Sequence, residues 1–98
     1  MLKKLKEILS DHKGKHNRIT SAKIALQLGI NEDDTHAKTR TLIFECAQKY
    51  KLPVAADSKG YYLITCQDEY DKYISNLNSR IEGIENRKKI ITENFNNA

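Results

Sequence analysis

Residues 20–30 of this 98-residue chain read TSAKIALQLGI, and this stretch decides the fold that the sequence predicts. The hydroxyl of Thr20 is suited to accept a hydrogen bond from a free amide in the first turn of a helix. Ile19 and Ile24 have the spacing of a hydrophobic staple across that helix start. Gly29 comes where a helix C-cap takes a left-handed backbone, which glycine adopts most easily. The stretch therefore predicts a short helix that ends in a tight turn.

A longer helix is expected over residues 34–50. The carboxylates of Asp33 and Asp34 suit the positive end of a helix, and Ile43 and Cys46 fall on one apolar face at helical spacing. Pro53 prevents the helix from continuing. Two helices joined by a short turn that contains glycine are typical of a helix-turn-helix.

A β-hairpin is expected next. Residues 53–56 (PVAA) and 61–64 (YYLI) have strand composition, and residues 57–60 (DSKG) form a turn between them. Residues 1–11 precede this unit as an amphipathic helix. The predicted fold class is α+β, mainly α: a winged helix-turn-helix domain over residues 1–66 with a hairpin wing, followed by a long helix over residues 67–98.

The C-terminal helix carries apolar residues at alternating spacings of four and three, which is the a/d pattern of a heptad repeat. We call this set the seam: Tyr70, Ile74, Leu77, Ile81, Ile84, Ile91 and Phe95. So long a helix extends beyond a domain of about 65 residues at 1.5 Å per residue. The seam therefore predicts a homodimer through a second copy of the helix. Gly83 and Lys88 leave open a bend or a helical hairpin instead.

Composition narrows the class of protein. The net charge is +4, and residues 1–20 alone hold six Lys and Arg against two acids. A basic segment beside a winged helix can bind the phosphate backbone of nucleic acid. No apolar run approaches the roughly 20 residues that span a bilayer. Two distant cysteines without a secretion signal favour a cytoplasmic protein with reduced thiols.

The helix over residues 34–50 is where a helix-turn-helix protein carries its base contacts. Lys38, Thr41 and Gln48 lie on its outer face and are candidates for base edges or phosphates. Lys15 and Arg18 in the basic loop and Lys59 at the hairpin tip are candidates for phosphate contacts. The predicted partner is double-stranded DNA.

Two segments also carry a resemblance. Residues 59–65 (KGYYLIT), followed by acidic residues and then residues 73–81 (YISNLNSRI), resemble small winged-helix proteins encoded by phages and prophages. The resemblance extends over about residues 18–90 and implies the same fold, a mobile-element origin and DNA binding as a transcriptional regulator or replication accessory. The acidic residues 32–34 depart from that pattern at the start of the reading helix.

A second hypothesis is a protein-interaction module, such as a phage inhibitor of a host defence or replication protein. Asp34, Phe44 and Glu45 on the outer face of the reading helix would form its contact surface, because an outward Phe is more typical of a protein contact than of a DNA contact. Winged helices serve both functions.

Catalysis and metal binding are the weakest interpretations. No P-loop, GxGxxG or HExxH motif is present, and no nucleophile is paired with a base. His12 and His16 have the spacing of two metal ligands on a helix, but Gly14 between them disfavours a helix there. We therefore expect no enzyme activity, no cofactor and no metal.

Overall fold

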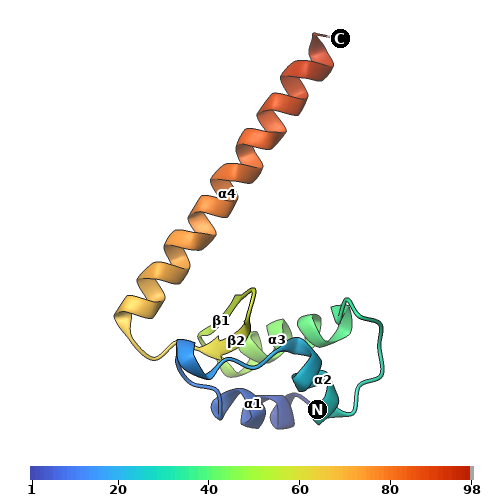
Figure 1. The fold of residues 1–98 in the computed structure, drawn as a ribbon, viewed down its shortest axis with the longest axis vertical. Helices are drawn as coiled ribbons and strands as arrows, with labels where there is room; N and C mark the ends of the chain where they lie inside the picture. The colour runs from blue at the N-terminus through green and yellow to red at the C-terminus, as the bar shows by residue number, and fades with distance from the viewer. Residues whose placement is uncertain (98) are drawn as a thin grey trace.

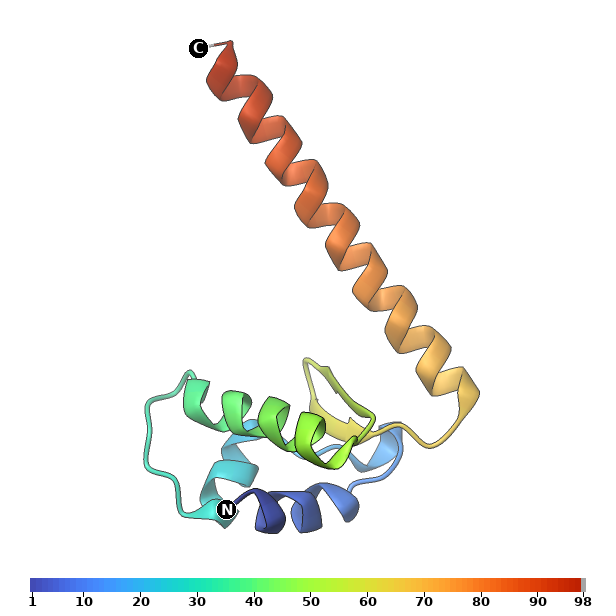
Figure 2. The same ribbon diagram turned by 180° about the vertical axis from the view of Figure 1, so that it is seen from behind.

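The computed structural model describes residues 1–97. Over these residues the chain forms four α-helices, one short 3-10 turn and a two-stranded antiparallel sheet (Figures 1 and 2). In chain order they are α1 (Leu2–Ser10), the 3-10 turn (Lys15–Asn17), α2 (Ser21–Leu28), α3 (Ala37–Tyr50), β1 (Val54–Asp57), β2 (Gly60–Leu63) and α4 (Gln67–Asn96). The chain is mainly helical, as predicted. Residues 1–66, which we call the N-terminal body, gather around one core, and α4 projects from them.

The core of the N-terminal body lies between α1, α2, α3 and β2. Leu5 and Leu9 of α1, Ile24 of α2 and Cys46 of α3 are fully buried. Helix α1 packs against α3, α2 and β2. Each buried Leu or Ile side chain contributes about 1.5–3 kcal/mol of transfer free energy. The apolar stripes on the helices therefore account for how the three helices pack together.

The hairpin is joined to the segment before α2. Strands β1 and β2 pair with Ala55 opposite Tyr62. Ile19 adds an isolated antiparallel bridge on the other side of β2, because the Ile19 and Tyr61 amides each donate to the other residue's carbonyl at 2.8 Å. A Cβ on Gly60 would lie 2.5 Å from the Ile19 oxygen. Only glycine therefore permits this close approach.

Helix α2 begins and ends where its capping residues predict. The hydroxyl of Thr20 accepts from the Lys23 amide at 3.2 Å. Gly29 has the left-handed backbone, with φ 69° and ψ 28°, and its amide donates back into the last turn. These local signals are confirmed.

The start of α3 differs from the prediction. The helix begins at Ala37, not at residue 34, and residues 31–36 form an irregular loop. The N-cap is His36, which has a left-handed backbone with φ 53°. Asp33 and Asp34 therefore do not form the first turn of the helix. Instead the carboxylate of Glu32 reaches the helix start from outside, accepting from the Lys38 amide at 3.0 Å.

Helix α4 has 30 residues and leaves the N-terminal body at one edge, as Figures 1 and 2 show from opposite sides. Near its start, Tyr73 faces the hairpin, where it lines a hollow together with Tyr62. Every described residue from 78 onward is exposed. More than half of the helix is therefore exposed to solvent.

The start of α4 is held by the carboxylate of Glu69. It accepts from the Thr65 amide at 2.9 Å and from the Thr65 hydroxyl at 3.0 Å. The other oxygen of Glu69 accepts from the Lys15 amide at 2.7 Å. These bonds lower the pKa of Glu69, with the Thr65 amide as the largest cause. Glu69 thus fastens the start of α4 to the 3-10 turn.

Candidate nucleic-acid interface

The outer face of α3 is the first candidate surface. Its exposed residues are Lys38, Thr41, Phe44, Glu45 and Gln48. The Thr41 hydroxyl donates to the Ala37 carbonyl at 3.0 Å, so only its lone pairs remain for an outside donor. Phe44 is 65% exposed. The face therefore offers one cation, two small polar groups, one carboxylate and one aromatic ring.

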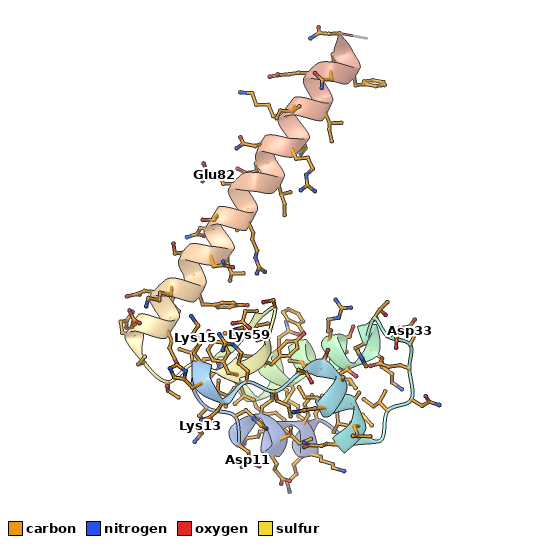
Figure 3. All side chains as sticks on the ribbon, viewed as in Figure 1. Asp11, Lys13, Lys15, Asp33, Lys59 and Glu82 are labelled. Atoms are coloured by element: carbon orange, nitrogen blue, oxygen red, sulfur yellow. The ribbon has the colours of Figure 1, made fainter. Side chains whose placement is uncertain are left out.

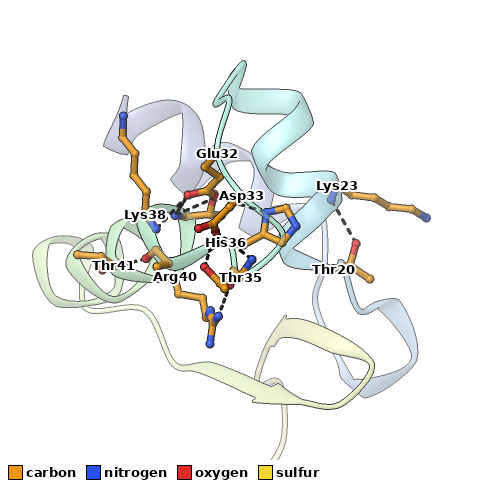
Figure 4. Close-up of polar contacts among 11 residues, drawn as sticks. Thr20, Lys23, Glu32, Asp33, Thr35, His36, Lys38, Arg40 and Thr41 are labelled. Atoms are coloured by element: carbon orange, nitrogen blue, oxygen red, sulfur yellow. Dashed lines mark hydrogen bonds and ion pairs between the residues drawn. The ribbon is translucent and has the colours of Figure 1, made fainter.

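The acidic stretch before α3 is largely directed at the protein's own backbone (Figure 4). The side chain of Glu32 is only 10% exposed and accepts from the amides of Lys38 and Thr39 and from the hydroxyl of Thr39. The Thr39 hydroxyl is the largest cause of the lowered pKa of Glu32, to which the amides of Thr39 and Lys38 add. Its negative charge therefore lies at the positive end of α3.

Asp33 is similarly engaged. Its carboxylate accepts from the Thr35 amide at 3.0 Å and from the Thr35 hydroxyl, which is the largest cause of its lowered pKa. The Arg40 guanidinium donates to the Thr35 carbonyl and so ties α3 to the same loop (Figure 4). Asp34 is exposed in the loop, so the prediction that it shares the outer helical face with Phe44 and Glu45 is wrong.

The hairpin tip lies beside the start of α3. An open hollow of about 370 Å³ separates them, and its lining includes Thr20, His36, Arg40 and Lys59. The turn is held by Asp57, whose carboxylate accepts from the Lys59 amide at 2.9 Å, while the Lys59 side chain is exposed. A ligand on α3 could therefore also reach the tip of the hairpin.

Arg18 differs from the other sequence-predicted cations. Its Nε donates to Asp57 at 2.7 Å, and its guanidinium lies 5.6 Å from the centre of the Tyr62 ring. Partial burial by itself raises the pKa of Asp57, but the hydrogen bond and charge of Arg18, together with the amides of Lys59 and Gly60, outweigh it and lower the pKa. The side chain of Arg18 is only 17% exposed. Its charge is paired with Asp57 in the hairpin. The position of Arg18 therefore does not support the expectation of a phosphate contact from this residue.

Lys15 lies on the opposite side of the hairpin from α3. It lines a hollow of about 140 Å³ with Tyr62 and with Lys72 and Arg80 of α4 (Lys15 and Lys59 are labelled in Figure 3). Lys72 pairs with Asp68 at 3.1 Å. Lys15 is far from Lys72 and Arg80 in the sequence, so only the fold brings these three side chains to one hollow. Lys15 and Lys59 therefore line different hollows.

Within residues 1–97, no helix combines the length and the apolar character needed to cross a membrane. Over the same residues, no three His, Cys, Asp or Glu side chains converge to form a metal site. Cys46 is buried, and burial raises the pKa of its thiol. Comparisons with family models, with curated proteins and with solved structures found no match to this chain.

Proposed function

We propose that this chain is a winged helix-turn-helix protein that binds double-stranded DNA as a homodimer, with α3 as the reading helix and the β1–β2 hairpin as the wing. The Ile19–Tyr61 bridge supports this assignment of the fold. It pairs the segment between α1 and α2 with the hairpin, and the order of helix, paired segment, two helices and hairpin matches the order in a winged helix.

The surface around α3 supports DNA as the partner. Lys59 on the hairpin tip lines the hollow at the start of α3 together with Arg40, and the side chain of Lys38 on the helix is exposed. Thr41 and Gln48 are polar groups of the kind that contact base edges. The hydrogen bonds of Glu32 to the start of α3 also turn one of the three acidic side chains of residues 32–34 inward.

A salt series with random-sequence duplex DNA tests the proposal. Log K should fall by about 0.9 per phosphate contact for each decade of salt. Lys38→Ala and Lys59→Ala should each weaken binding and reduce that slope by about one contact. Lys4→Ala is the matched control, because Lys4 is exposed on α1 and lies outside the proposed interface. Absence of binding at low salt, or an equal loss in the Lys4 variant, would overturn the proposal.

A second candidate function rests on the exposed ring of Phe44. An apolar hollow of about 320 Å³ lies beside it, lined by residues that include Ile43, Val54, Tyr61 and Tyr73. This surface favours a protein-interaction module, with Phe44 and Glu45 as contacts. Phe44→Ala should then abolish capture of a protein partner, whereas Lys38→Ala should leave it intact. A phage or mobile-element origin would suit either function.

A further inference from the structure

We infer that the seam of α4 pairs antiparallel with the seam of a second copy, in the register that places Ile81 opposite Ile84 of the partner subunit. This inference rests on the dimer in the proposed function and extends it to the orientation of the two chains. Three properties of the described residues support it: the exposed area of the seam, its position relative to the N-terminal body and the chemistry of its layers.

The seam is a large uncovered apolar surface. Ile81, Ile84, Ile91 and Phe95 are between 55% and 79% exposed, and Tyr70 is 48% exposed. At these fractions the seam offers on the order of 600 Å² per helix, which is at the upper end for the largest apolar patch of a monomer. It approaches the ~800 Å² that each partner buries in a standard interface. A second copy of the helix is long enough to cover all of it.

The seam is also free of the N-terminal body. The residues of α4 that line the hollow beside the hairpin include Lys72, Tyr73, Asn76 and Arg80. At 100° per residue their mean direction lies roughly 90° from that of the seam. The packing of α4 on the hairpin therefore occupies one flank of the helix. The seam is half-buried at Ile74 and Leu77 and exposed at its other positions.

The layers fit an antiparallel pair better than a parallel one. The spacing assigns Ile81 and Lys88 to a positions, and Leu77, Ile84 and Ile91 to d positions. A parallel dimer would face Lys88 with Lys88 of the partner subunit, and it would place isoleucine at two d positions, where leucine favours two strands. In the antiparallel register, a positions face d positions. Lys88 then faces Leu77 of the partner subunit, and the two lysines lie about 16 Å apart along the axis.

The same register accounts for the ends of the seam. It places Ile74 opposite Ile91 of the partner subunit and Tyr70 opposite Phe95 of the partner subunit. Aromatic pairs of the second kind are favourable beyond the area that they bury. All the seam residues from Tyr70 to Phe95 are then paired without an overhang.

The flanking charges taken alone favour the parallel orientation. Arg80 and Glu85 of the partner subunit would attract each other in a parallel pair, whereas an antiparallel pair brings Arg80 near Arg87 of the partner subunit. Arg80, however, lines the hollow that also includes Asp57, on the flank that faces the hairpin. Its charge is therefore directed toward the N-terminal body, which weakens both effects. The remaining preference comes from the apolar layers and Lys88.

The antiparallel pair would carry its two N-terminal bodies at opposite ends. The two-fold axis crosses α4 between residues 82 and 83, midway along the seam. Two reading helices would then be held apart by rigid helices and not side by side at one end of a coiled coil.

Cys66 provides a native reporter of the orientation. It is exposed immediately before α4, whereas Cys46 is buried in the core. A nitroxide maleimide on the full-length protein should label Cys66, and Cys66→Ser controls for labelling elsewhere. In the proposed register the two Cys66 residues lie about 50 Å apart along the helix axis, so pulsed dipolar spectroscopy should report a distance near that value. A parallel pair would give about 10–20 Å.

The outcomes separate the two proposals. A short distance, or an intermediate one from a shifted register, overturns the antiparallel inference and leaves the dimer intact. A protein that sediments as a monomer without dipolar coupling overturns the inference and the proposed dimer together, while the salt series still decides DNA binding.

Cross-linking provides a second measurement. The double variant Tyr70→Cys/Phe95→Cys, in a Cys66→Ser background, should form an intermolecular disulfide, because the two positions are about 37 Å apart within one helix. Either single variant should form none. An intermolecular disulfide in either single variant, or none in the double variant, would overturn the inference.

Discussion

Replacing Gly60 tests whether the β1–β2 hairpin is held to the segment before α2 through Ile19. In Gly60→Ala, the new Cβ would lie 2.5 Å from the Ile19 oxygen and 2.8 Å from its carbonyl carbon, and the backbone φ of 136° disfavours any side chain. Strain of this kind costs about 1–3 kcal/mol. Separating Ile19 from Tyr61 also removes two hydrogen bonds worth about 1 kcal/mol each. We therefore expect a loss of about 3–5 kcal/mol in the free energy of unfolding.

Urea unfolding followed by circular dichroism measures this loss, and the corresponding fall in Tm should exceed about 12 °C. Gly29→Ala is the matched control, because Gly29 also has a positive φ of 69° but has no atom within 4 Å of a new Cβ. It should cost only the left-handed strain of about 1–2 kcal/mol. If Gly60→Ala is no more destabilising than Gly29→Ala, the close approach to Ile19 does not hold the wing, and the reasoning from the bridge is refuted.

Three further predictions concern the seam, the reading helix and the hairpin. Ile84→Asp should raise the dimer dissociation constant more than about 100-fold in sedimentation, because it buries a charge in the seam. Ser79→Asp, on the opposite side of α4, should leave the dissociation constant unchanged. An unchanged dimer in Ile84→Asp would contradict pairing through α4. Glu45→Gln should tighten binding to duplex DNA about two- to five-fold at low salt, which is the effect of one surface charge. Glu82→Gln on α4 should leave DNA binding unchanged. Weaker binding by Glu45→Gln would count against DNA on this face of α3. Asp57 has a lowered pKa beside Arg18, so its contribution is fully present above its ordinary value of 3.8 and is lost as pH falls through the lowered folded pKa. The difference in unfolding free energy between the wild type and Asp57→Asn should therefore be largest near pH 7 and shrink below pH 3.8, and a difference that is constant with pH would show that the ion pair does not stabilise the hairpin.

Helix bounds were predictable where the capping groups are close in sequence. Thr20 accepts from an amide three residues away, and Gly29 ends α2 through its own φ, so both signals are contained in one short stretch. The start of α3 was not predictable in the same way. Glu32 caps it from six and seven residues upstream, across a loop whose course the local sequence does not specify.

The candidate interface was predictable only in part. Exposure of Lys38, Thr41 and Gln48 follows from helical periodicity, and the structure agrees with it. Periodicity has no information about Arg18, which is paired with a carboxylate 39 residues away. A count of charges along the chain therefore overstates the basic surface at Arg18 and the acidic surface at Glu32.

The sequence alone determined what depends on neighbours within a few residues: the helices, the turn after α2, the hairpin and the apolar repeat of α4. The tertiary structure decided what depends on distant partners, such as the bridge of Ile19 to Tyr61, the pairing of Arg18 with Asp57 and the bond from Lys15 to Glu69. The physical reason is range. Capping, periodicity and backbone preference act along the chain, whereas the charges and amides that meet across a fold are chosen only when packing brings them together.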